Sequence, residues 1–116
     1  FENQFLNNEP LTIVGDGEQR RDFTHIDDII DGIVKCVDKE HKGEIFELGS
    51  GKNYSINEVA SIFDCAKTYI SDRPGEYDLT LCDWSKAERE LGYKPTGDLK
   101  KYITDWVSEV SKRSNI

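Results

Sequence analysis

The segment from Gly15 to Asp28 constrains this chain most, because it joins a turn, two adjacent arginines, a short strand and the start of a helix. The residues before it, Leu11-Thr12-Ile13-Val14, predict a strand, and the glycines that follow give the backbone freedom of a tight reversal. The chain therefore turns back and presents Arg20 and Arg21 at the end of a rigid element. Arginine suits phosphate, because its planar fork forms bidentate hydrogen bonds and keeps its charge at any working pH.

A second arginine lies far along the chain, in the turn sequence Arg73-Pro74-Gly75-Glu76. The Pro-Gly pair favours a turn that fixes the direction of the neighbouring side chain. Together the two arginine segments predict a clamp for a diphosphate. The residues alone also allow a simpler interpretation, in which Arg20 and Arg21 form a solvated charged pair on a loop.

Short strand patterns alternate with helix patterns along the chain, which predicts the α/β class. Strands are predicted over residues 11–14, 44–48 and 68–70, with a brief extended piece over 79–82. Helices are predicted over residues 1–8, over about 28–38 after a cap at Asp27, after capping boxes at Ser55-Glu58 and Ser85-Glu88, and after a cap at Asp98. Residues 111–116 are polar and are expected to fray.

Length and composition narrow the class of protein. A chain of 116 residues makes one small domain, and because it contains no methionine we interpret it as a fragment. The formal net charge of −8 argues against nonspecific binding to nucleic acid or to an anionic membrane. Its three cysteines follow no metal-ligand or disulfide pattern, which favours reduced thiols in a cytoplasmic protein. No apolar run approaches the roughly 20 residues of a membrane span.

The order of the motifs resembles one known family. Gly15-Asp16-Gly17-x-Gln19-x-Arg21-Asp22-Phe23-x-His25-Ile26-x-Asp28 is similar to the segment that opens the C-terminal part of the extended short-chain dehydrogenase/reductases. These are NAD-dependent nucleotide-sugar epimerases and dehydratases, with UDP-glucose 4-epimerase among them. Further similar motifs follow in the family's order: Phe46-Glu47-Leu48-Gly49-Ser50-Gly51, Tyr54-Ser55-Ile56-Asn57-Glu58-Val59-Ala60, Arg73-Pro74-Gly75-Glu76, Asp83-Trp84-Ser85-Lys86-Ala87 and Glu90-Leu91-Gly92-Tyr93-Lys94-Pro95.

The resemblance implies that residues 1–116 are the small C-terminal substrate-binding lobe of a two-lobed enzyme. It implies that an N-terminal Rossmann domain, absent from this chain, binds NAD and carries the catalytic Tyr-x-x-x-Lys. No residue in this chain is therefore assigned a catalytic, cofactor-binding or metal-binding role, and the fragment alone is expected to be inactive. The full-length protein is expected to be a homodimer, in which NAD oxidises the sugar at C4.

Carried over by position, four residues are expected to bind the nucleotide sugar. Arg21 matches the arginine that contacts the diphosphate, and Arg73 matches a second arginine on its opposite side. Glu76 stands where an aspartate usually bonds the ribose hydroxyls. Phe23 stands where family members carry an aromatic residue beside the nucleotide, although a core aromatic on a strand explains it equally well.

Three neighbouring residues have simpler explanations. Asp28 matches a family acid, but helix capping and a favourable charge at the positive helix end account for it. His25 is expected to be a packed or hydrogen-bonded structural histidine. Glu47 stands where the family often has asparagine, so no polar role is assigned to it.

Several functions stay open from the sequence. The leading hypothesis is the substrate-binding part of an epimerase that acts on a UDP-, dTDP- or GDP-linked hexose. Within the family, a 4,6-dehydratase or a UDP-glucuronate decarboxylase also fits. Outside it, the chain could be a stand-alone, non-catalytic nucleotide-sugar-binding or interaction domain, or a purely structural dimerisation domain.

Overall fold

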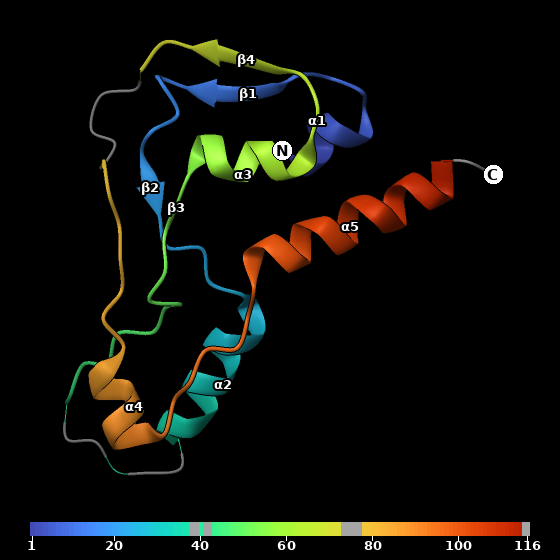
Figure 1. Cartoon of the computed structure of the whole chain (residues 1–116). Helices are drawn as coiled ribbons and strands as arrows, with labels where there is room; N and C mark the ends of the chain where they lie inside the picture. The colour runs from blue at the N-terminus through green and yellow to red at the C-terminus, as the bar shows by residue number, and fades with distance from the viewer. Residues whose placement is uncertain (38–39, 41–42, 73–77, 115–116) are drawn as a thin grey trace. The chain divides into compact units, whose positions relative to one another are not determined.

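The computed structural model describes residues 1–37, 40, 43–72 and 78–114. Their helices and strands confirm the α/β class (Figure 1). In chain order the elements are α1 (Glu2–Leu6), β1 (Leu11–Val14), β2 (Arg20–Arg21), α2 (Ile26–Val37), β3 (Tyr54–Ser55), α3 (Ile56–Phe63), β4 (Lys67–Ile70), α4 (Ser85–Leu91) and α5 (Leu99–Ser114).

Contacts divide the chain into two compact units. The first unit comprises Phe1–Arg21, Tyr54–Leu79 and Lys100–Ile116, and the second comprises Asp22–Asn53 and Thr80–Leu99. Each unit is assembled from segments that are far apart in the sequence. The pattern of elements along the chain cannot show this, because it does not tell which segments share a core.

The first unit is built on a parallel pair of strands, β1 and β4, which lie side by side in Figure 1. Their register runs from Leu11 opposite Lys67 to Val14 opposite Ile70. Leu11 and Ile13 are fully buried, in the alternating pattern of a strand with one face on the core. β4 is exposed along its length, so β1 supplies the buried side of this pair.

An aromatic cluster closes the core of the first unit. The ring centroids of Phe5 and Trp106 are 5.6 Å apart, and Phe63 lies 5.8 Å from both Phe1 and Phe5. These spacings are typical of tilted and edge-to-face aromatic pairs. Ile103, one turn before Trp106, is 5% exposed. The apolar stripe predicted on the last helix therefore belongs to the core.

The capping box predicted at Ser55 is confirmed at the start of α3. The Ser55 hydroxyl accepts a hydrogen bond from the Glu58 amide at 3.0 Å, and the Glu58 carboxylate accepts one from the Ser55 amide at 3.1 Å. Each side chain thus satisfies a backbone donor that has no partner within the helix.

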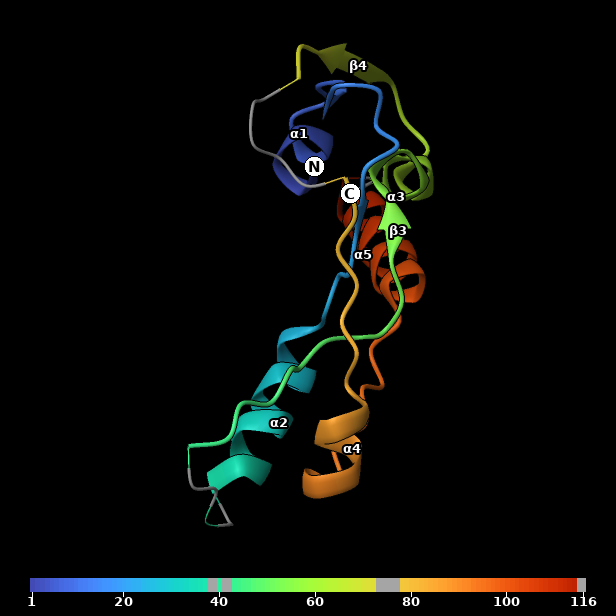
Figure 2. The same cartoon turned by 90° about the vertical axis from the view of Figure 1, so that its left-hand side faces the viewer.

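The second unit packs α2 beside α4, as Figure 2 shows. Its core contains Ala87, Leu91 and Tyr93, and the Tyr93 side chain is fully buried. The packing at Gly32 in α2 is close, because a Cβ there would lie 2.6 Å from Leu48 and 3.1 Å from Tyr93. The side chains of Leu48 and Tyr93 fill the space at this glycine.

Two predicted helix starts are wrong. α2 begins at Ile26. The imidazole Nδ1 of His25 accepts a hydrogen bond from the Asp27 amide at 3.0 Å, so the side-chain acceptor at this helix start is His25 and not the carboxylate of Asp27. α4 begins at Ser85 itself, with no side-chain cap from its N-cap residue. Asp83 accepts the Ser85 amide at 3.0 Å instead. In both places an acceptor two residues before the amide forms the local bond, so pattern matching selects the wrong residue.

The predicted strand over 44–48 belongs to none of the ladders formed by the described residues. A strand needs a partner to satisfy its backbone groups, and sequence alone does not provide one. The sequence also predicts a frayed tail over residues 111–116, but α5 continues to Ser114, and residues 115–116 lie outside the described residues. Lys112 and Arg113 stand at the end of the helix, where positive charge is favourable.

Gly17 is essential to the turn between β1 and β2, because its φ is +77° and a Cβ would lie 2.2 Å from the Asn57 side-chain oxygen. Asn57 cannot move freely, since its amide donates to the Asp16 carbonyl at 2.9 Å. We expect Gly17→Ala to lower the free energy of unfolding by about 1–2 kcal/mol more than Gly92→Ala. Gly92 is a matched control, with a φ of +72° and open space around it. Equal losses in urea unfolding would contradict the role of Asn57.

The described residues contain no helix long and apolar enough to cross a membrane. Cys36, Cys65 and Cys82 are free thiols and are half-buried.

Candidate functional site

The two arginines of the organising segment lie on β2, which pairs antiparallel with β3. Arg20 stands opposite Ser55, and Arg21 stands opposite Tyr54. The Arg20 amide also donates to the Asp78 carbonyl at 2.8 Å. The predicted rigid element is therefore a short strand held by backbone bonds on both sides.

The two arginine side chains have different partners. The Arg20 guanidinium meets Glu58 through both of its terminal nitrogens, at 3.3 and 3.4 Å. The Arg21 guanidinium donates to the Arg20 carbonyl at 2.9 Å and is half-buried. Arg20 is thus engaged with a carboxylate, whereas Arg21 meets no carboxylate among the described residues.

Asp22, directly after Arg21, gathers three segments of the second unit around one carboxylate. It accepts hydrogen bonds from the Thr24 hydroxyl, the Ser50 hydroxyl and the amides of Ser50, Gly51 and Cys82, the three amides each at 3.0 Å. Burial raises the pKa of Asp22, but the bonds from Ser50, Cys82 and Gly51 outweigh it and hold the pKa below its ordinary value. Sequence reasoning missed this role, because the donors are backbone amides that leave no pattern in the sequence.

A recess of about 360 Å³ opens beside Asp22 in the second unit. It is lined by Asp22, Thr24, Glu47, Leu48, Gly49, Thr80, Leu81 and Cys82. Burial, and the nearby charges of Asp22, Glu47 and Asp83, raise the pKa of the Cys82 thiol. The thiolate is disfavoured there, so Cys82 is a poor nucleophile.

The structure describes two of the four predicted binding residues. Arg21 belongs to the first unit, and Phe23 belongs to the second. Phe23 is half-buried in an irregular segment, so it is not the core aromatic on a strand that the sequence also allowed. Arg73 and Glu76 lie outside the described residues.

Asp28 is a structural anchor with long-range partners. It is 6% exposed and accepts bonds from the Thr96 amide at 3.0 Å and the Gly97 amide at 2.9 Å. The sequence predicts a charge at the start of a helix, which is confirmed, since Asp28 lies in the first turn of α2. Its bonds to residues 96 and 97 were not predicted.

The Tyr93 hydroxyl provides a second anchor in the same unit, where it donates to the Gly49 carbonyl at 2.8 Å. Burial and nearby carboxylates raise the pKa of Tyr93 to about 12. This tyrosine is therefore a buried structural donor.

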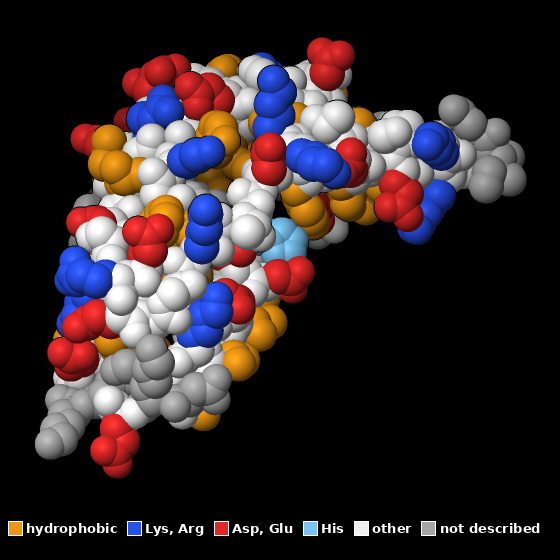
Figure 3. Space-filling view, turned by 60° about the horizontal axis from the view of Figure 1, so that its bottom comes forward, with side chains coloured by type: hydrophobic (Ala, Val, Ile, Leu, Met, Phe, Trp, Pro, Cys, Tyr) orange, Lys and Arg blue, Asp and Glu red, His pale blue; other side chains and the backbone are white. Residues whose placement is uncertain are grey.

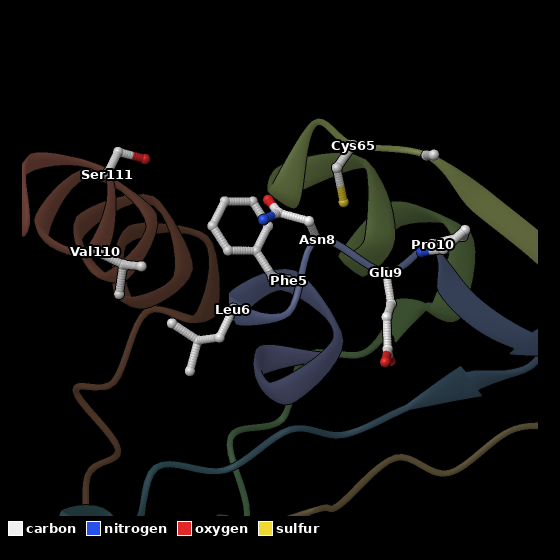
Figure 4. Close-up of a pocket in the computed structure, with 9 residues that line it drawn as sticks. Phe5, Leu6, Asn8, Glu9, Pro10, Cys65, Val110 and Ser111 are labelled. Carbon is white, nitrogen blue, oxygen red and sulfur yellow. The ribbon is translucent and has the colours of Figure 1, made fainter. Parts of the chain in front are cut away.

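A second recess, of about 450 Å³, lies in the first unit and is shown in Figure 4. Its lining combines α1 and the residues after it, the turn before β4, and one side of α5. The labelled side chains include Phe5, Leu6 and Val110, together with polar Asn8 and Glu9. No group of three or more metal-binding side chains occurs anywhere in the described part of the chain.

These features define an α/β chain that carries two arginines on a short strand. The family model described as GDP-mannose 4,6 dehydratase matches residues 2–106. The chain belongs to the extended short-chain dehydrogenase/reductases, the family of nucleotide-sugar epimerases and dehydratases, as the order of its motifs predicts.

Individual relatives support this assignment. The chain is 37% identical, over 93% of its length, to the uncharacterized UDP-glucose epimerase YtcB of Bacillus subtilis. It is 34% identical, over 87% of its length, to the UDP-glucuronate 4-epimerase of Thermodesulfobacterium geofontis. It spans 36% of the first protein and 34% of the second, so it matches about a third of these relatives.

Solved structures show the same fold. The UDP-glucuronic acid 4-epimerase of Bacillus cereus, in complex with UDP-glucuronic acid and NAD, matches 95% of this chain with a TM-score of 0.81 and 34% identity. The dTDP-glucose 4,6-dehydratase DesIV of Streptomyces venezuelae, with NAD bound, matches 97% of it with a TM-score of 0.83 and 25% identity. The matched regions are 38% and 37% of those two proteins.

Proposed function

We propose that this chain is the nucleotide-sugar-binding part of an NAD-dependent nucleotide-sugar epimerase or dehydratase, and that Arg21 and Arg73 clamp the diphosphate. One observation carries the proposal. Asp72 lies so close to Gly15 that a Cβ at this glycine would overlap its carboxylate, and the Asp78 carbonyl accepts a bond from the Arg20 amide at 2.8 Å. Asp72 and Asp78, the described residues on either side of Arg73, therefore both lie against the stretch from Gly15 to Arg21.

The parallel pairing of β1 and β4 explains this arrangement. Carboxyl ends of paired parallel strands meet at one edge of a sheet, and the Gly15 amide donates to the Ile70 carbonyl there at 2.8 Å. Both arginine segments begin at this edge. Two charge-assisted contacts of about 1.5–3 kcal/mol each would hold the diphosphate, with Glu76 on the ribose hydroxyls and Phe23 beside the nucleotide.

We assign the chemistry to the rest of the protein. The relatives extend well beyond the matched region, and the solved epimerase and dehydratase contain NAD. In this proposal a dinucleotide-binding domain of the same polypeptide binds NAD, which oxidises the sugar at C4. The lobe described here positions the substrate for that step, a contribution that can lower a barrier by several kcal/mol.

The exposed side of α2 supports such a partner domain. Five aliphatic side chains recur along this helix at helical spacing and are each more than half exposed: Ile26, Ile30, Ile33, Val34 and Val37. On the face of the molecule shown in Figure 3, charges of both signs are dispersed and hydrophobic side chains are exposed between them. Contiguous apolar surface of this kind marks an interface, and we propose that the dinucleotide-binding domain covers it.

A charge on this helix face should destabilise the full-length protein. Ile33 is 53% exposed, and burying an aspartate against the partner domain would cost more than burying the isoleucine. We expect Ile33→Asp to lower the free energy of unfolding of the full-length protein by about 1–2 kcal/mol, measured in urea. Leu6→Asp is the control, because Leu6 is 51% exposed on α1. An equal loss from both substitutions would argue against an interface on α2.

Product analysis tests the proposed activity. The full-length protein should be incubated with NAD and, separately, with UDP-glucose, UDP-glucuronate, dTDP-glucose and GDP-mannose, and the products identified by NMR. An inverted C4 centre identifies an epimerase, a 4-keto-6-deoxy sugar a dehydratase, and a pentose a decarboxylase. No change in any of these substrates would contradict the proposal and favour a stand-alone binding domain.

A further inference from the structure

The two arginines of β2 must point in opposite directions. Successive side chains on a strand project to opposite faces, and β2 consists of Arg20 and Arg21. Its register with β3 is defined, with Arg20 opposite Ser55 and Arg21 opposite Tyr54. Whatever fixes the face that Arg20 occupies therefore also fixes the face of Arg21.

Glu58 occupies the face of Arg20. Its two carboxylate oxygens meet the two terminal nitrogens of the Arg20 guanidinium at 3.3 and 3.4 Å, in the paired geometry that arginine forms with carboxylates. The ion pair is partly exposed, with 36% of the Arg20 side chain and 50% of the Glu58 side chain accessible. Such a pair adds little stability by itself.

Glu58 is itself held in place from two sides. One of its oxygens accepts the Ser55 amide at 3.1 Å, and its own amide donates to the buried Ser55 hydroxyl at 3.0 Å. The Ile56 amide then donates to the Gln19 carbonyl at 3.1 Å, which joins the start of α3 to the residue before Arg20. Ser55, Glu58 and Arg20 are therefore linked in a ring of contacts, because Ser55 is also the residue opposite Arg20 in the strand pair.

We propose that Glu58 is a positioning residue, which holds Arg20 on one face of β2 and so directs Arg21 to the opposite face, where it meets the diphosphate. This inference rests on the proposed function of Arg21. It assigns the paired arginines different tasks: Arg21 binds the ligand, and Arg20 orients the strand. Glu58 does not touch the ligand and acts through Arg21.

Glu58→Gln tests the proposal in the full-length protein. Glutamine still accepts the Ser55 amide and keeps the capping box, but it loses the charge that pairs with Arg20. The probe is whichever of UDP, dTDP and GDP binds the unsubstituted protein most tightly by calorimetry. We expect Glu58→Gln to weaken binding about two- to fivefold, and Arg20→Gln to do the same. In a protein that already carries Arg21→Ala, we expect Glu58→Gln to change affinity no further.

The outcomes separate the two proposals. If Arg21→Ala leaves affinity unchanged, the proposed function of Arg21 fails. If Arg21→Ala weakens binding but Glu58→Gln does not, or if Glu58→Gln weakens it equally with and without Arg21, the positioning role is overturned. Glu109→Gln is the matched control, because Glu109 forms an exposed ion pair with Arg113 on α5. An equal loss from Glu109→Gln would show a general charge effect and would also overturn the proposal.

Discussion

Asp22→Asn is expected to lower the free energy of unfolding at pH 7 by about 2–4 kcal/mol. Three backbone amides and two hydroxyls donate to this carboxylate. Asparagine keeps the size of the side chain but replaces one accepting oxygen with a donor. Amides of Ser50, Gly51 and Cys82 would then share one remaining acceptor. Urea unfolding of the variant measures the loss.

The pH dependence of stability should change in the same variant. Because the folded-state pKa of Asp22 lies below its ordinary value of 3.8, the folded state binds this proton less readily than the unfolded state. The contribution of Asp22 is therefore complete above about pH 4 and is lost as the pH falls through the lowered folded-state pKa. Asp22→Asn should remove that part of the acid dependence and leave a flatter curve.

Asp105→Asn provides the control for both measurements. Asp105 forms an exposed ion pair with Lys101 on α5, at 2.6 Å, and pairs of this kind contribute about 0.3–0.5 kcal/mol. A loss from Asp22→Asn no larger than that of Asp105→Asn would show that the carboxylate does not hold the three segments together.

Arg21→Ala should weaken nucleoside diphosphate binding by the full-length protein about 10- to 100-fold. Within the described residues the Arg21 side chain makes one hydrogen bond, to the Arg20 carbonyl, so its loss should affect the ligand more than the fold. Arg21→Lys keeps the charge but loses the planar fork, and we expect an intermediate loss. Calorimetric titration and thermal unfolding of each variant separate affinity from stability.

Arg113→Ala is the matched control for Arg21. Arg113 pairs with Glu109 on the exposed surface of α5, and we expect its removal to leave affinity unchanged. A lysine at position 21 that binds as tightly as arginine would mean that charge alone, without paired hydrogen bonds, holds the ligand.

Local patterns predicted the elements whose stabilising bonds are local. The capping box of Ser55 and Glu58 forms within one helical turn. The strand over 68–70 was recognised from its residues, and β4 covers it as Lys67–Ile70. These features depend on neighbours a few positions away, which the sequence shows directly.

Features that depend on distant partners could not be predicted. Asp28 was explained by its own helix, yet it holds residues 96 and 97. Asp22 was passed over, although amides from residues 50, 51 and 82 converge on it. Amides carry no residue-specific signal, so a sequence cannot show which carboxylate they reach.

The candidate site was predicted unevenly for a related reason. The turn before Arg21 predicted that the arginine stands at the end of a rigid element, and Arg21 lies on β2. The short strand predicted after the arginines is wrong, because residues 22–25 are irregular. The ion pair of Arg20 did not follow, because its partner Glu58 is 38 residues away and was already explained by the capping box. The Glu58 carboxylate accepts from both the Ser55 amide and the Arg20 guanidinium, and the sequence pattern indicates only the first of these bonds.

The central claim, a diphosphate held by Arg21 and Arg73, is tested most directly by one titration. UDP, dTDP and GDP are titrated calorimetrically into the full-length protein and into the variant with both Arg21→Ala and Arg73→Ala. The account predicts that one nucleotide binds the unsubstituted protein and that the double variant loses this binding, with its unfolding temperature unchanged. Equal affinity in the two proteins would contradict it, because the diphosphate would then be held by other residues.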